Sequence, residues 1–169
     1  MKAAQRTVAK VGLSLLAGVL FLAGCRPEEK FPVEPRLEFR SLEVFGDSAS
    51  LVVYFTDGDG DVGLDPGDIQ PPFDTTSAYY HNFFVEHYYR QNGEWVHHPF
   101  TEFPMYYRVP RLTPTGQNKA LEGEIALAID PLPLYVAPGA DTVRYTVYMV
   151  DRALHHSNTV TSSELVLGQ

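Results

Sequence analysis

The amino-acid sequence predicts an all-β fold, and three observations support this prediction. Among 169 residues, 13 glycines and 13 prolines provide many turn positions. Ten tyrosines and ten phenylalanines provide side chains that favour strands. Several segments alternate apolar and polar residues or cluster β-branched and aromatic ones, whereas no long helical repeat is visible. Length and composition therefore indicate one globular β domain with a short additional segment.

Strand candidates follow one another along the chain, separated by turn residues. Residues 37–44 alternate apolar and polar side chains with one phase slip, as expected for a half-buried edge strand. Residues 51–56 form a continuous β-branched and aromatic run, which is typical of a strand that is central in its sheet or buried on both faces. Further strands are predicted at 83–90, 94–98, 106–112, 121–129, 143–150 and 159–167.

Turn signals between these segments favour a particular architecture. Asn92-Gly93 tolerates the positive φ angles of a type I′ turn and predicts a hairpin. The connection from Asp57 to about Asn82 holds several prolines, so we expect it to be the longest irregular segment of the domain. Seven or eight strands with this spacing predict an immunoglobulin-like β-sandwich over residues 37–169, which is expected to contain no disulfide.

The first 24 residues are predicted to be a cleaved lipoprotein signal peptide. Residues 1–10 carry three basic side chains and no acid, and residues 11–23 are almost wholly apolar. This run is too short to span a ~30 Å hydrocarbon core as a helix. It ends in Leu22-Ala23-Gly24-Cys25, which resembles the bacterial lipobox. Cys25 is therefore expected to accept a diacylglyceryl group, to become the mature N-terminus and to carry two or three acyl chains, palmitate among them.

Residues 25–36 are predicted to form the lipidated cysteine and an extended tether. Residues 26–36 hold three prolines and charges of both signs, a composition that favours a spacer over a packed element. Arg26 stands where an inner-membrane retention signal usually has Asp, and Glu28-Glu29 resembles an acidic surface-export patch of some Bacteroidota lipoproteins. These residues favour the outer membrane, and both the periplasmic and the surface-facing leaflet stay open.

The charge balance limits the partners. The chain has 21 acidic and 13 basic residues, which gives a formal charge of −8. The signal peptide contains three of the basic residues and none of the acidic ones, so its removal makes the net charge more negative. Nucleic-acid binding is excluded because it requires clustered Lys and Arg. Anionic headgroups would repel such an acidic surface, so the membrane is expected to hold the protein through its lipid alone.

Aromatic residues and histidines allow more than one interpretation. The aromatic run could be a stacking platform for sugars or peptides, but alternate rings of a strand face inward, so a role in the core is the simpler interpretation. The residues concerned are Tyr79, Tyr80, Phe83, Phe84, Tyr88, Tyr89, Trp95, Tyr106 and Tyr107. His97-His98 and His155-His156 suggest zinc, but neighbouring residues of a strand point to opposite faces and cannot chelate one ion.

Residues 57–68 have the carboxylate spacing of a calcium-binding loop. Carboxylates occupy relative positions 1, 3, 5, 9 and 12, namely Asp57, Asp59, Asp61, Asp65 and Asp68. Interleaved glycines let the backbone curl so that these side chains converge on one cation. Val62 replaces an expected glycine and no helices flank the loop, so it is not an EF-hand, and weak Ca²⁺ affinity is expected. The alternative is a solvated acidic turn.

A second loop is expected at the same end of the sandwich. In an immunoglobulin-like fold, the loops that follow 51–56 and 143–150 lie together. The second of these loops is 151–158, and its Asp151 is predicted to help complete the metal shell. Asn158 can supply a further oxygen or act as a plain turn cap, and the cap is the favoured interpretation.

Four elements together resemble a known group of proteins. These elements are Cys25, the segment 55–64, Leu121-Glu122-Gly123-Glu124-Ile125 and the segment 151–158. They resemble Bacteroidota lipoproteins that have a DGDGD(V/I)GL loop and no assigned activity. The resemblance covers roughly residues 22–167 and implies an immunoglobulin-like fold and an envelope location. It implies no catalytic residues.

Two classes of function remain. The leading hypothesis is a non-enzymatic, lipid-anchored module that binds an envelope protein or an extracellular polymer, with Ca²⁺ stiffening its loop end. The alternative is a metal-dependent hydrolase, or an accessory subunit of an envelope enzyme or uptake complex, that uses the ion or a His155 base oriented by Asp151. The sequence lacks a nucleophile motif, which favours binding, and no catalytic residue is assigned.

Overall fold

A computed structural model describes residues 31–112, 120–132 and 136–167. The chain divides into two units, Met1–Lys30 and Phe31–Gln169, and the description below concerns the second. The predicted signal peptide 1–24, Cys25 and the tether residues Arg26, Glu28 and Glu29 lie outside the described residues. No helix in the described ranges is long and apolar enough to cross a membrane.

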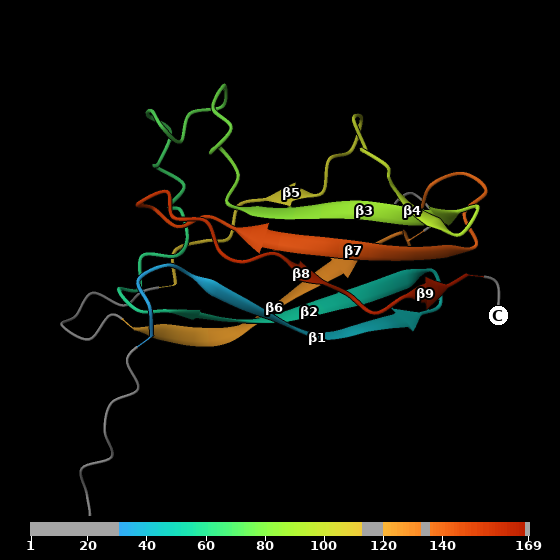
Figure 1. The fold of residues 1–169 in the computed structure, drawn as a ribbon. Coiled ribbons are helices and arrows are strands. Elements are labelled where there is room, and N and C mark those ends of the chain that lie inside the picture. The colour runs from blue at the N-terminus through green and yellow to red at the C-terminus, as the bar shows by residue number, and fades with distance from the viewer. Residues whose placement is uncertain (1–30, 113–119, 133–135, 168–169) are drawn as a thin grey trace, which may run out of the picture. The chain divides into compact units, whose positions relative to one another are not determined.

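Two antiparallel sheets face each other in a sandwich-like arrangement (Figure 1). One sheet has the order β1-β2-β6, with bounds Arg36–Phe45, Ser48–Asp57 and Leu121–Ile129. The other has the order β4-β3-β7-β8, with bounds Glu94–His97, Phe83–Gln91, Thr142–Met149 and Val160–Thr161. In addition, β5 (Tyr106–Tyr107) pairs with β3, and β9 (Leu165–Val166) pairs with β7. The predicted all-β class is confirmed.

The strands form because alternate apolar residues share a core between the sheets. Every second residue of β2 is buried, and β2 is the central strand of its sheet. The inward side chains of β2 and β7 are Ala49, Leu51, Val53, Phe55, Val143, Tyr145, Val147 and Met149. Burial of each larger side chain of this set stabilises the fold by about 1.5–3 kcal/mol before losses of entropy are counted.

Details of several strands follow the sequence signals. The phase slip in the first strand corresponds to a register shift between Phe39 and Ser41, as at a β-bulge. The predicted hairpin is confirmed, because Asn92 and Gly93 have φ angles of 51° and 86° between β3 and β4. Residues 58–82 connect β2 to β3 with no helix or strand, apart from an isolated bridge at Leu64.

Two predicted strands are much shorter than expected. The segment 106–112 yields only the two residues of β5. Two residues further on, the backbone N–H of Val109 donates to the side-chain Oδ1 of Asn82 at 2.7 Å and not to a neighbouring strand. The segment 159–167 divides into β8 and β9. Between these strands, the Ser162 hydroxyl accepts a hydrogen bond from the backbone N–H of Tyr145 at 3.0 Å, a place that a backbone carbonyl would otherwise take.

His87 is an unexpected polar residue of the core. Its side chain is 1% exposed and is surrounded by Phe100, Tyr145 and His98, whose ring centroids lie 5.1, 5.4 and 6.0 Å away. Neither imidazole nitrogen has a hydrogen-bond partner among the described residues. Burial, with smaller effects of the neighbouring histidines, lowers the pKa of His87 from 6.5 to about 4.

We expect the substitution His87→Phe to remove an acid-dependent loss of stability. The unfolded chain binds a proton at His87 near pH 6.5, whereas the folded protein does so only near pH 4. Above pH 6.5, His87 is neutral in both states and does not lower the free energy of unfolding. Between pH 6.5 and about pH 4, only the unfolded chain binds the proton, so the free energy of unfolding falls by about 3 kcal/mol. Denaturant titrations at about pH 7 and about pH 4.5 should show a smaller fall in the variant.

The substitution Tyr145→Phe is the matched control for this experiment. It alters the same ring cluster but leaves His87 in place, so it should keep the acid dependence of the wild type. A parallel loss of stability in the wild type and in His87→Phe would contradict the assignment of a neutral, buried His87.

Candidate metal site

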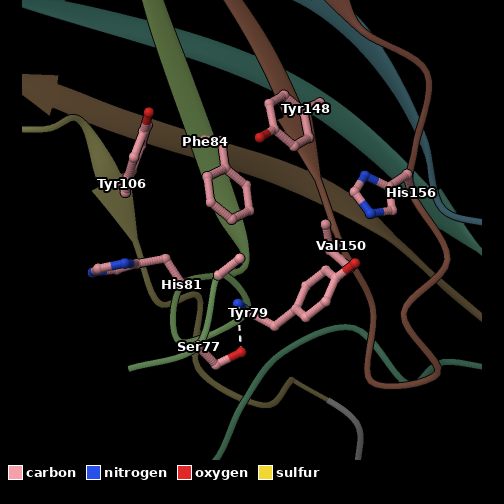
Figure 2. A pocket seen from close by; sticks show the side chains of 9 residues that line it. Ser77, Tyr79, His81, Phe84, Tyr106, Tyr148, Val150 and His156 are labelled. Carbon is pink, nitrogen blue, oxygen red and sulfur yellow. Dashed lines mark hydrogen bonds between the residues drawn. The ribbon is translucent and has the colours of Figure 1, made fainter. Parts of the chain in front are cut away.

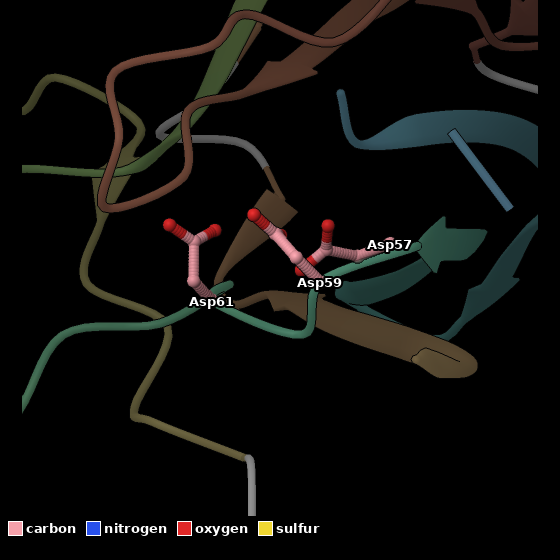
Figure 3. A group of neighbouring side chains, drawn as sticks. All are labelled: Asp57, Asp59 and Asp61. Carbon is pink, nitrogen blue, oxygen red and sulfur yellow. The ribbon is translucent and has the colours of Figure 1, made fainter. Parts of the chain in front are cut away.

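Three aspartates converge where β2 runs into the loop 58–82. Asp57 is the last residue of β2 and continues its inward alternation, so its side chain is fully buried. Asp59 and Asp61 follow in the loop and are half-buried. One carboxylate oxygen from each residue lies within 4.8 Å of the others (Figure 3). Within the described ranges, this is the one group of three or more His, Cys, Asp or Glu side chains with metal-binding geometry.

Hydrogen bonds satisfy only part of this acidic triad of Asp57, Asp59 and Asp61. The Oδ2 atom of Asp57 accepts the N–H of Val62 at 3.0 Å, and Oδ2 of Asp61 accepts the N–H of Ala153 at 3.1 Å. The Oδ1 atoms of all three aspartates are buried and have no hydrogen-bond partner among the described residues. Buried carboxylate oxygens without partners are unfavourable, and a bound cation would compensate them.

The electrostatics of the triad also favour a cation. Burial, followed by repulsion from Asp59, Asp61 and Asp151, raises the pKa of Asp57 from 3.8 to about 7. Burial and the charges of Asp151 and Asp59 raise the pKa of Asp61. A divalent cation would remove this repulsion and hold the three carboxylates ionised. The triad could therefore hold a metal ion, and oxygen ligands of this kind suit Ca²⁺.

The other two aspartates of the predicted loop are paired with arginines. A carboxylate oxygen of Asp65 lies 3.3 Å from Nη1 of Arg111, at an exposed position. Asp68 forms an ion pair with both terminal nitrogens of Arg152, and this interaction holds the pKa of Asp68 below its usual value. The structure thus brings together Asp57, Asp59 and Asp61, whereas Asp65 and Asp68 pair with arginine side chains.

Asp151 lies beside the triad, as the predicted proximity of the two loops requires. It follows β7, and its charge raises the pKa values of Asp57 and Asp61. Both of its own carboxylate oxygens are used within the loop 151–158. Oδ1 accepts the N–H of His155 at 2.8 Å, and Oδ2 lies 2.9 Å from His155 Nδ1. This contact raises the pKa of His155.

The chain matches no protein-family model, no curated protein and no solved structure. The structure supports the coarse features of the resemblance described above, a β-rich domain of two sheets with an acidic triad.

Asn158 joins two elements and is not part of the triad. Its Oδ1 atom accepts the backbone N–H of Leu37 at 2.8 Å, and its Nδ2 atom donates to the carbonyl of Leu37 at 2.9 Å. Asn158 therefore fastens the loop 151–158 to β1. Its role is therefore structural, as in the turn-cap interpretation, but the backbone that it binds is that of the distant Leu37 and not that of its own turn.

Arg108 and Arg152 organise the site, and the sequence did not indicate either role. Arg108 donates to the carbonyl of Tyr80 at 2.6 Å and to the carbonyls of Asp65 and Asp68 at 3.1 Å each. Arg152 joins the loop 151–158 to Asp68 in the loop 58–82. No local sequence signal could have revealed these contacts, because every partner is at least 28 residues away.

Proposed function

We propose that this protein is a lipid-anchored module of the bacterial cell envelope that binds a partner, has no catalytic activity, and has a loop end ordered by Ca²⁺. Support for the ion comes from one observation above all: three converging aspartates present buried, unpartnered Oδ1 atoms. Support for the location comes from the lipobox-like end of the segment 1–25.

The strand orders support an immunoglobulin-like topology as part of this proposal. In that fold the first two strands share a sheet with the fifth, while the third, sixth and seventh form the facing sheet. Here β1 and β2 pair in one sheet with β6, and β3 pairs with β7 in the other. The loops that follow β2 and β7 then lie at one end, where Asp61 accepts the N–H of Ala153.

The chain enters the domain beside the acidic triad. The N–H of Gly58, between two of the aspartates, donates to the carbonyl of Pro32 at 2.8 Å. In the proposed arrangement, the lipid on Cys25 anchors the chain in the outer membrane and the tether leads into the domain at the loop that holds the ion.

Calcium-dependent melting tests this proposal. In about 10 mM Ca²⁺, a site with a Kd of 10⁻⁴ to 10⁻³ M should stabilise the wild type by about 1.4 to 2.7 kcal/mol. The melting temperature should therefore rise by several degrees relative to EDTA, and respond less to Mg²⁺. In Asp59→Asn/Asp61→Asn the calcium response should vanish. In EDTA this variant should melt at or above the wild type, because repulsion within the triad is reduced.

The variant Asp65→Asn/Asp74→Asn is the matched control, since it removes the same number of charges from the same loop without altering the triad. It should keep the full response to Ca²⁺. A wild-type melting curve that ignores both calcium and chelator would leave the triad as an acidic turn and contradict the proposal.

A second candidate function has one specific observation in its favour. Asp151 orients the imidazole of His155 through the 2.9 Å contact at Nδ1, next to the triad, as in a metal-dependent hydrolase that uses a histidine base. This candidate predicts calcium-dependent hydrolysis of model esters or phosphodiesters that is lost in His155→Gln, while calcium-dependent melting is kept. Absence of such an activity in the wild type supports the binding module.

A further inference from the structure

A second site lies on the outer face of the sheet that contains β3 and β7. Phe84 and Tyr148 are opposite one another in the register of these strands and both point away from the core. Together with Tyr79, His81, Tyr106 and His156, they line a pocket of about 430 Å³ (Figure 2). This volume is within the range of small-ligand sites, about 300–1,000 Å³.

The walls of this aromatic pocket are built before any ligand arrives. Phe84 and Tyr148 stack with ring centroids 4.7 Å apart and planes 7° apart, and Tyr106 packs edge-on against Phe84 at 5.2 Å. His156 stacks against Tyr148 at 6.1 Å, and Tyr79 packs edge-on against the same imidazole at 6.0 Å. The rings come from β3, β5, β7 and two loops. The hydrogen bond from Arg108 to the carbonyl of Tyr80 and the ion pair of Arg152 with Asp68 hold these loops in place.

The lining chemistry selects the class of ligand. None of the nine residues that line the pocket is Asp, Glu, Lys or Arg, and such a lining favours a neutral ligand. The floor consists of ring carbon atoms, while phenol and imidazole groups and the hydroxyl of Ser77 provide polar edges. A pyranose ring matches this pattern, because it combines C–H faces with a rim of hydroxyl groups. Aromatic side chains with a polar tip suit such amphipathic surfaces.

A cationic ligand, which an aromatic cage would otherwise suit, is disfavoured by the surroundings. The nearby carboxylate of Glu86 already accepts a hydrogen bond from the Tyr106 hydroxyl at 3.0 Å and contacts His97. The guanidinium of Arg108 lies 4.8 Å from the ring centroid of Tyr80, next to His81 in the chain, and burial together with this charge lowers the pKa of His81. A positive charge therefore flanks the pocket already.

The same sheet face continues away from the pocket with further rings. Tyr88 lies opposite Arg144 and His97 in the strand register, on the same side of the sheet as Phe84. The guanidinium of Arg144 stacks 4.2 Å from the ring centroid of Trp95. The pocket and these rings lie on the same face of the sheet, with Glu86 between them, and this face offers further rings to a polymer longer than a single sugar.

We propose that the aromatic pocket binds a sugar ring of a neutral extracellular polysaccharide, an inference that rests on the proposed function as a binding module and names its ligand class. The pocket is also connected to the acidic triad. His156 forms one wall, and its loop is bonded to Asp61 through the N–H of Ala153. Binding of the polysaccharide should therefore be tighter in calcium than in EDTA.

Affinity gel electrophoresis of the full-length protein, in a detergent without a sugar headgroup, tests the inference. The gels contain glycogen, mannan, xyloglucan or mixed-linkage β-glucan, with polygalacturonate as the anionic control and tetramethylammonium as a competing cation. We expect retardation by at least one neutral polymer, and loss of about tenfold in affinity, or about 1.4 kcal/mol, in Tyr148→Ala. Tyr79→Ala removes a ring from the loop without altering a strand and should also weaken binding.

The matched control is Tyr54→Ala, which removes a tyrosine from the outer face of the opposite sheet and should leave retardation unchanged. Retardation by no neutral polymer, retardation that Tyr148→Ala and Tyr79→Ala both leave intact, or competition by tetramethylammonium would overturn the inference. Calcium-dependent melting distinguishes the two proposals. If that response persists without polysaccharide binding, the ligand class is wrong while the calcium-ordered module stands.

Discussion

Replacing Cys25 by alanine is expected to release the protein completely from the membrane fraction. Cys25 is the only cysteine, so no other thiol can accept the diacylglyceryl group. Without acyl chains, the remaining attraction to the bilayer is lost, because an acidic surface is repelled by anionic headgroups. Metabolic labelling with radioactive palmitate and ultracentrifugation of cell lysates measure both effects. The label should disappear and the protein should move from the pellet to the supernatant.

The control for this experiment is Gly24→Ala, which keeps a small residue before the cysteine and should preserve labelling and sedimentation. If Cys25→Ala still incorporates palmitate and still sediments with membranes, the segment 1–25 does not direct lipidation, and the proposed location is wrong.

The second large effect is expected from Gly63→Ala, which should destabilise the domain by about 3 kcal/mol or more. Gly63 has a φ of +101°, a backbone conformation that L residues rarely adopt. An added Cβ would lie 2.3 Å from the carbonyl oxygen of Pro110 and 2.6 Å from Cα of Arg111, and backbone atoms cannot yield as a side chain can. The contact also carries the hydrogen bond from Leu64 N–H to the carbonyl of Val109 at 2.9 Å.

Denaturant titration of Gly63→Ala beside Gly67→Ala isolates this effect. Gly67 lies in the same loop but has no atom within 4 Å of an added Cβ, so its substitution should change the free energy of unfolding by less than about 1 kcal/mol. Equal stabilities of the two variants would show that the close approach between 63–64 and 109–111 does not contribute as described.

Much of the fold could be predicted because burial on one face imposes alternation on the sequence. The predicted segment 121–129 has the same bounds as β6, and 51–56 lies within β2. The errors occur where long-range or side-chain effects decide. Beyond β5, the side chain of Asn82 accepts the backbone N–H of Val109, and Ser162 separates β8 from β9.

The candidate metal site was predictable only in its local part. Asp57, Asp59 and Asp61 alternate within five residues, and a curled backbone brings such neighbours together. The partners of Asp65 and Asp68 come from Arg111 and Arg152, far along the chain, and local spacing does not specify them.

The aromatic run shows a similar limit of sequence analysis. The period of a strand requires half of its rings to face inward, but the sequence does not indicate what the other half faces. In the structure, Phe83 is buried in the core, whereas Phe84 faces the pocket together with Tyr148. Pairing between β3 and β7 therefore decides which rings of the run face the core and which face the pocket.

Calcium binding at the acidic triad is tested most directly by a crystal structure of the protein soaked in calcium, with anomalous difference density used to locate the ion. We expect one calcium peak bonded to Oδ1 of Asp57, Asp59 and Asp61, at about 2.3–2.6 Å from each oxygen. No peak at the triad in tens of millimolar calcium, or a calcium peak held by other residues, would contradict calcium binding by these three aspartates.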